Sequence, residues 1–223
     1  MVGRQPDGRI VTTERTTLTQ LRGKETRQRI LDAAYLVFAR QGLGHASVDD
    51  VAREAEISKG ALYHHFSSKE ELFHALLRDR IRRCATTMLL AATPISPLPQ
   101  AIRKVIEASF ESQHTNPNWM PMYMEFWGQA VREDYSRSVM ADSHQDCRKT
   151  LSQILRNGQE LGLVRPDLDT ETAAVLYIAL VDGIALQRQV DPAIDLNKAK
   201  ELMADMIVGF IKSQPTGRRG RSS

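Results

Sequence analysis

Apolar side chains recur at helical spacing along most of the chain, and no segment alternates apolar and polar residues as a half-buried strand would. Residues 98–110 follow the pattern most closely, with their apolar positions on one face of a helix. We therefore expect an all-α fold of about nine helices. The expected helices are 24–41, 48–55, 59–66, 68–92, 98–110, one starting near Asn116, 134–161, and two final helices capped by Thr170 and Asp195.

The segment 47–66 contains two short helices joined by a tight turn. Ser47 lies three residues before Asp50, a spacing that predicts a reciprocal capping box at the start of the first helix. Ser58 is placed to cap the second helix. Because two helices this short bury little surface alone, the arrangement is typical of a unit that presents its second helix outward. Major-groove readers of the helix-turn-helix kind are built in this way.

The second helix of this motif has two chemically different faces. Leu62 and Phe66 are expected to face the core, whereas Lys59, Tyr63 and His64 are expected to face outward. One cation and two hydrogen-bond donors on the same face suit contact with phosphate oxygens. An isolated aromatic residue at such a position is also consistent with an ordinary core, so the interpretation depends on the whole motif.

Charge is distributed unevenly along the chain, whose net charge is +3. Residues 1–29 carry seven basic and three acidic side chains, and the segment from Lys212 onward carries four basic side chains and no acidic one. The ends are therefore basic and the body acidic, which favours a polyanionic partner at the ends. Solubilising disordered tails are an equally good explanation of each end taken alone.

Several function classes find no support in the sequence. No run approaches the roughly 18 to 20 apolar residues of a membrane span, and the first residues have no leader-like apolar segment, so we expect a cytoplasmic protein without membrane contact. Cys84 and Cys147 lack the spacing of zinc or disulfide sites, and the adjacent His64 and His65 point in different directions on a helix. We expect no metal, no cofactor and, without a catalytic constellation, no enzymatic activity.

The run from Thr26 through Leu76, with ILDAAYLVFARQG and SVDDVAREAEISKGALYHHFSSKEEL, closely resembles the signature of the TetR family. The resemblance implies a dimer that places two recognition helices in successive major grooves of an operator. The residues that it implies at the DNA surface are Ser47, Lys59, Gly60, Ala61, Tyr63, His64 and Lys69. The chain departs from the family at Glu56, where glycine is common, with a strain of roughly 1 kcal/mol if the turn needs a positive φ.

The second half carries a weaker resemblance to the sensing domains of a TetR subclass, through MEFWGQAVRE and LVRPDLDTETAAVLYIALVDGIALQ. It implies that the last two helices pair with those of a second copy in a four-helix interface. The residues expected there are Ile178, Val181, Ile184, Ala185, Leu202, Met206 and Phe210. The alternative is that these apolar faces form the ordinary core of a monomer.

The stretch 119–127 is unusually dense in aromatic and thioether side chains, which line adaptable apolar pockets but more often form core. Glu125 or His144 could anchor a polar group of a hydrophobic or amphipathic effector. The residues expected to line the pocket are Met88, Phe110, Trp119, Met122, Tyr123, Phe126, Trp127, His144 and Tyr177.

The sequence thus predicts a homodimeric repressor that binds a palindromic operator in double-stranded DNA. A small molecule is expected to release the repressor from this operator. The alternative is a DNA-binding regulator without a ligand. The expected organisation is a flexible basic arm (1–22), a DNA-binding domain (23–84, motif 47–66), a ligand-binding and dimerisation domain (85–212) and a basic disordered tail (213–223).

Overall fold

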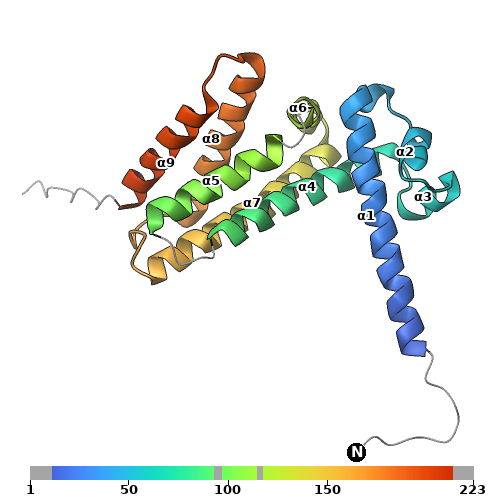
Figure 1. The fold of residues 1–223 in the computed structure, drawn as a ribbon, viewed down its shortest axis with the longest axis horizontal. Coiled ribbons are helices and arrows are strands. Elements are labelled where there is room, and N and C mark those ends of the chain that lie inside the picture. Colours follow the sequence, from blue (N-terminus) through green and yellow to red (C-terminus); the bar gives the residue numbers. More distant parts are fainter. Residues whose placement is uncertain (1–11, 93–96, 115–117, 213–223) are drawn as a thin grey trace, which may run out of the picture. The chain divides into compact units, whose positions relative to one another are not determined.

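The computed structural model describes residues 12–92, 97–114 and 118–212. Within these ranges the chain forms nine α-helices and no strand (Figure 1), which confirms the predicted all-α fold. The helices are α1 (Thr12–His45), α2 (Val48–Glu54), α3 (Lys59–His65), α4 (Lys69–Ala92), α5 (Leu98–His114), α6 (Trp119–Ala130), α7 (Asp134–Glu160), α8 (Thr170–Val190) and α9 (Leu196–Lys212).

The chain divides into two compact units, Met1–Leu76 and Leu77–Ser223. Helix α4 contributes its first two turns to the first unit and the rest of its length to the second. The sequence-based domain boundary after residue 84 lies two turns further along the same helix and stays a prediction.

Helix α1 is longer than the sequence predicted. It begins at Thr12, so residues 12–22, expected to be a flexible arm, are helical. A single glycine at Gly23 does not stop it, because extending an existing helix adds one hydrogen bond for each residue that is fixed. Gly42, the expected end, breaks the helix with φ 75° and ψ 158°, and one more turn follows to His45. The remaining arm residues, 1–11, and the predicted tail, 213–223, lie outside the described residues.

The first unit is built around the apolar stripe of α1. Ile30, Leu31 and Phe38 are fully or almost fully buried, and the ring of Phe38 meets that of Phe73 from α4 edge-on, with centroids 5.8 Å apart. The guanidinium of Arg27 covers the ring of Phe66 at 5.1 Å. These contacts form the support on which α2 and α3 are held.

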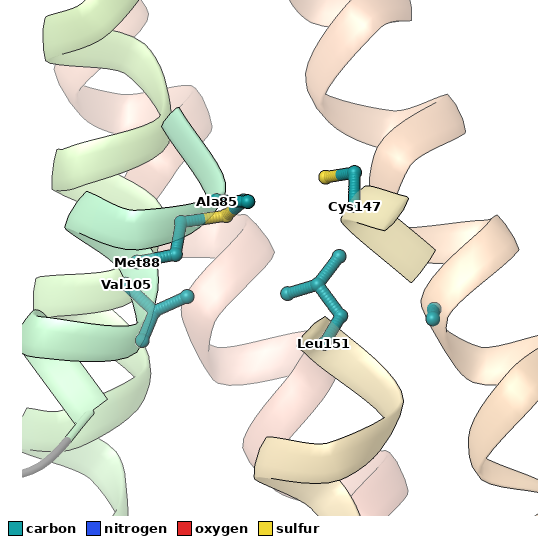
Figure 2. Close-up of a cluster of buried hydrophobic side chains, with 6 residues drawn as sticks. Ala85, Met88, Val105, Cys147 and Leu151 are labelled. Carbon is teal, nitrogen blue, oxygen red and sulfur yellow. The ribbon is translucent and has the colours of Figure 1, made fainter. Parts of the chain in front are cut away.

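In the second unit, α7 packs along α8 and α5 packs along α9. Ile106 and Phe110 of α5 bury themselves against Val181 of α8 and Met203 of α9. Figure 2 shows a second cluster, in which Met88 and Val105 point toward Cys147 and Leu151 of α7. Residues of the two clusters also line a cavity and a groove in this unit.

The caps of the last two helices were predicted with mixed success. Asp195 caps α9 as expected, accepting from the amides of Asn197 and Lys198 at 3.1 Å each. Thr170 was the wrong residue for α8, because Asp169 accepts from the amides of residues 171 and 172. The hydroxyl of Thr170 is instead buried 2.7 Å from that of Ser152.

Helix α8 is also long and apolar enough, by length and composition alone, to cross a membrane. This is weak support for a membrane span, since a helix of a soluble protein passes the same test. One side of α8 packs in the unit's interior through Ala174 and Val181.

Candidate nucleic-acid interface and ligand cavity

Helix α2 starts at the capping box that the sequence predicted. The Ser47 hydroxyl accepts from the amide of Asp50 at 3.1 Å, and the Asp50 carboxylate accepts from the Ser47 amide at 3.2 Å. The hydroxyl also donates to this carboxylate at 2.6 Å, and these hydrogen bonds lower the pKa of Asp50. The Ser47 hydroxyl is thus engaged within the cap, and its approach to DNA stays a prediction.

The turn after α2 requires a left-handed residue. Glu56 has φ 53° and is the single non-glycine residue with positive φ in the described part of the chain. The turn is closed by backbone hydrogen bonds from the amide of Glu56 to Arg53 and from that of Ile57 to Ala52. Glu56 therefore stands at a position whose left-handed backbone conformation glycine adopts with little strain.

Helix α3 is anchored on one face and open on the other. The Ser58 hydroxyl caps it by accepting from the amide of Ala61 at 3.1 Å. Leu62 is fully buried and Phe66 is 2 % exposed. The residues on its open face are Lys59, Gly60, Tyr63 and His64, with Ala61 half-buried beside them. A Cβ built on Gly60 meets nothing within 4 Å, so packing inside the chain does not require glycine there.

Lys59 has a partner that the sequence did not reveal. Its ammonium lies 2.8 and 3.0 Å from the two carboxylate oxygens of Asp49 on α2. The hydrogen bond and the charge of Asp49 raise the pKa of Lys59. The ion pair holds the ammonium at the start of α3 and offsets part of its charge.

Lys69 has a role inside the first unit. Its ammonium donates to the carbonyls of Leu43 at 2.8 Å and Ala46 at 3.2 Å, at the end of α1. Carbonyls there lack helical partners, so Lys69 satisfies groups that would otherwise need water. Two of its three donors are engaged in this way, and the expected phosphate contact stays a prediction.

A cavity of about 70 Å³ lies in the second unit, among α4, α5, α6, α7 and α8. Five of the nine residues expected to line a pocket line it: Met88, Trp119, Tyr123, His144 and Tyr177. The lining residues that were not expected in the pocket are Arg80, Ile81, Cys84, Ser109, Cys147, Ile178, Val181 and Asp182, of which Ile178 and Val181 were expected at the dimer face. Cys84 and Cys147 are free thiols.

The other expected pocket residues are placed elsewhere. Phe110 belongs to the core cluster of α5, α8 and α9, and Met122 and Phe126 are buried outside the cavity lining. Trp127 does not line the cavity, but its ring lies edge-on to that of His144, which does, with centroids 5.4 Å apart. Glu125 is exposed, which is wrong for a pocket anchor. An α-helix turns about 100° per residue, so positions four apart, such as Trp119 and Tyr123, share the cavity face and their neighbours do not.

A hydrogen-bonded chain crosses one wall of the cavity. The Tyr123 hydroxyl lies 2.7 Å from Nε2 of His144 and donates to the Asp182 carboxylate at 3.3 Å. Burial raises the pKa of Asp182 to about 6, and burial with the charge of Arg148 lowers the pKa of His144 to about 4. Near neutral pH the imidazole is therefore uncharged and the carboxylate is mostly charged. Asp182 was missed, although a single acid within the apolar run LYIALVDGIAL is an available signal.

A second and larger hollow, the apolar groove, has a volume of about 600 Å³. It is lined by α4, α5, α7, α8, α9 and the turn after α7, and no charged side chain is among its lining residues. Tyr177 lines both the groove and the cavity. Representative lining residues are Leu98, Ile102, Leu155, Leu176, Leu180 and Phe210.

The expected dimer face is exposed on α9 but not on α8. Leu202, Met206 and Phe210 are 63, 57 and 47 % exposed. On α8, by contrast, Val181 is buried, and the other expected residues, Ile178, Ile184 and Ala185, are half-buried against the core clusters. The exposed large apolar residues of α8 are Val175, Leu176, Leu180, Leu186 and Val190. Because α8 is apolar around much of its circumference, its sequence does not distinguish the two faces, and the dimer residues expected on α8 stay a prediction.

Among the described residues, no group of three or more His, Cys, Asp or Glu side chains is placed to hold a metal ion.

Two family models match the chain. One, described as bacterial regulatory proteins of the tetR family, matches residues 30–76, and the other, described as the C-terminal domain of BetI-type transcriptional repressors, matches residues 99–212. The regulator BetI of Agrobacterium fabrum is 27 % identical over 202 residues, covering 88 % of this chain and 93 % of its own. The regulator TtgR of Pseudomonas putida is 27 % identical over 212 residues, covering 90 % and 98 %.

Solved structures share the fold. A putative TetR-family regulator from Rhodococcus sp. superposes with a TM-score of 0.74 at 23 % identity, covering 85 % of this chain and all of its own. A putative regulator from Saccharomonospora viridis, in complex with choline, gives a TM-score of 0.66 at 22 % identity, covering 82 % and 96 %.

Proposed function

Because the chain belongs to the TetR family of transcription regulators, we propose that it is a homodimeric repressor that a small molecule releases from its operator. Regulators of this family are DNA-binding transcription factors rather than enzymes, and they are typically homodimers. The proposed place of action is the cytoplasm, where a bacterial operator lies.

The exposed side chains on the open face of α3 support the proposed binding to DNA. Leu62 and Phe66 fix the helix from beneath, so Lys59, Tyr63 and His64 are presented together. Side chains of these types donate to phosphate oxygens, and the small Gly60 allows close approach to base edges. In a dimer, two such helices would enter major grooves one turn apart, roughly 34 to 36 Å.

The exposed apolar residues of α8 and α9 support the dimer. Leu176 and Leu180 on α8 and Met206 and Phe210 on α9 are all more than a third exposed in the single chain. A contiguous apolar surface of this kind is stabilised when a second surface covers it. A two-fold axis would place α8 and α9 against the same two helices of a second copy, which gives a four-helix interface.

The cavity supports a ligand-responsive regulator over one without a ligand, for which a solid core would be expected. Helix α4 begins in the DNA-binding unit at Lys69 and lines the cavity through Arg80, Ile81, Cys84 and Met88. An effector that binds one position of α4 better than another would shift its population and change the spacing of the recognition helices. We propose an apolar or amphipathic effector, with polar contacts from Tyr123, His144 and Asp182.

The DNA-binding part is tested by comparing Tyr63→Ala with Tyr135→Ala. Both tyrosines are exposed, at 45 and 59 %, and Tyr135 lies on α7 in the other unit. Fluorescence anisotropy with the chain's own promoter should show roughly tenfold weaker binding for Tyr63→Ala, since a hydrogen bond to phosphate is lost. Tyr135→Ala should bind as the wild type does. Equal affinities for all three proteins would contradict the proposed role of α3.

A further inference from the structure

The two helices of the helix-turn-helix carry more negative than positive charge. Within the described helices α2 and α3, the basic side chains Lys59 and Arg53 stand against the three acidic side chains Asp49, Asp50 and Glu54. The ammonium of Lys59 lies 2.8 and 3.0 Å from the Asp49 carboxylate oxygens, and the guanidinium of Arg53 lies 3.1 Å from the Asp50 carboxylate. Both cations of the motif are therefore neutralised, although binding to a polyanion is favoured by positive charge.

The two acids of these ion pairs have different roles. Asp50 belongs to the cap of α2, where it is hydrogen-bonded to Ser47, and its contact with Arg53 stays within one helix. Asp49 instead reaches Lys59, ten positions away at the start of α3, and the two side chains are 54 and 59 % exposed. An ion pair as exposed as this one adds little to the stability of a fold. Its position beside the open face of α3 points to an effect on DNA binding.

The ion pair changes how Lys59 attracts phosphate. An ammonium group has three donors, and the Asp49 oxygens occupy one side of it, so a donor remains for a phosphate that approaches from another side. Seen from several ångströms away, the opposite charges of the pair nearly cancel and attract a phosphate weakly. A phosphate that approaches on the Asp49 side meets a like charge, which disfavours that arrangement. The pair therefore favours DNA docked in one register over DNA held loosely.

We propose that Asp49 is a specificity-determining residue, whose carboxylate neutralises Lys59 toward non-specific DNA but leaves the ammonium a donor for one phosphate of a docked operator. The inference rests on the proposed binding of DNA through α3. Non-specific affinity is almost wholly electrostatic, whereas operator affinity also includes contacts with base edges. Asp49 thus lowers the first more than the second, which raises the ratio between them. This ratio matters because an operator competes with a large excess of other sequences.

Asp49→Asn tests the proposal, with Asp134→Asn as a matched control. Asp134 also lies in the first turn of a helix and is paired with an arginine, Arg137, at 2.6 Å, but it belongs to α7 in the other unit. Both variants lose one negative charge. Fluorescence anisotropy at a series of salt concentrations measures the binding of the full chain to its own promoter and to a scrambled duplex of the same length.

Asp49→Asn should bind the scrambled duplex roughly threefold more tightly at low salt, because the Lys59 ammonium is no longer neutralised. The plot of log affinity against log salt concentration should become steeper by about 0.9 for each α3 that contacts the DNA. Affinity for the promoter should rise less, so the promoter-to-scrambled ratio should fall. Asp134→Asn should match the wild type in all three measures. An unchanged salt slope or an unchanged ratio for Asp49→Asn overturns the proposal.

A double variant shows whether the effect acts through Lys59. Adding Lys59→Met to Asp49→Asn should return the salt slope on the scrambled duplex to the wild-type value, since no ammonium remains to be freed. A double variant as steep as Asp49→Asn alone overturns the proposal. Asp49 is exposed and the cap of α2 is formed by Asp50, so circular dichroism should show unchanged folding. Asp49→Ala is a second way to remove the carboxylate.

The experiment separates this inference from the proposed function. A wild-type chain that binds the promoter and the scrambled duplex equally contradicts operator binding, and the salt slopes on the scrambled duplex then still test the neutralisation of Lys59. A wild-type chain that prefers its promoter, with Asp49→Asn behaving identically, contradicts the role of Asp49 alone.

Discussion

Glu56 is held in a backbone conformation that L-amino acids avoid, with φ 53°. The left-handed region costs a side-chain-bearing residue roughly 1 to 2 kcal/mol, and glycine gives back part of this through its larger entropy when unfolded. Glu56→Gly should therefore stabilise the chain by about 0.5 to 1 kcal/mol, seen as a melting temperature higher by about 1 to 4 °C. Glu56→Ala, which removes the carboxylate but keeps the Cβ, should show no such gain. Equal gains in both variants would assign the effect to charge.

Asp182 makes stability depend on pH. Its pKa of about 6 in the folded chain exceeds the ordinary 3.8, so between these values the folded state holds more protons than the unfolded state. The free energy of unfolding therefore falls as pH rises through this window, by about 3 kcal/mol at most. His144 acts in the opposite direction, because its pKa of about 4 lies below the ordinary 6.5 and stability is gained as pH rises between them.

Asp182→Asn should isolate the carboxyl's contribution. The variant should match the wild type near pH 4 and be more stable near pH 8, with the difference developing between pH 4 and about 6. Urea unfolding at a series of pH values measures it. A difference between the two proteins that does not change with pH would show that Asp182 titrates normally.

Some of these residues were readable from the sequence and others were not. Ser47, Ser58 and Glu56 act within a few positions of themselves, so local spacing identifies them. The partners of Lys69 lie 23 and 26 positions away, and the hydrogen-bond partner of Asp182, Tyr123, lies 59 positions away on another helix. Such contacts depend on how helices pack, which periodicity does not specify.

At the scale of the helix, α8 and α9 also show that the apolar pattern of a sequence does not specify how a helix packs. Helix α9 has one clearly apolar face, on which the expected dimer residues Leu202, Met206 and Phe210 are exposed in the single chain. Helix α8 is apolar on both its buried and its exposed sides, as Val181 and Leu180 illustrate. The sequence therefore located the helix but could not choose between its faces.

The exposed stripe of α9 is the place to test dimerisation. Met206→Asp introduces a charge at the proposed interface, where its desolvation would oppose association, so this variant should shift toward monomer. Val131→Asp, at a 69 % exposed position between α6 and α7, should leave the oligomeric state unchanged. Sedimentation velocity at matched concentration measures the outcome. A wild-type chain that sediments as a monomer, or a dimeric Met206→Asp, would contradict this interface.

For the whole molecule, α4 is the element that joins the two proposed activities, since it begins in one unit and lines the cavity of the other. The fold class and the helix-turn-helix were predictable because their signals are local and periodic. The complete lining of the cavity, the groove and the Asp49–Lys59 pair were not, because each arises where separate helices meet.

The most direct test of the account is selection of DNA from a random library by the purified chain. A dimer that reads DNA through α3 should enrich an inverted repeat whose half-sites lie about one helical turn apart, and Tyr63→Ala should lose most of that enrichment. Enrichment of no sequence, or the same enrichment by Tyr63→Ala, would contradict the claim that this chain is an operator-binding regulator acting through α3.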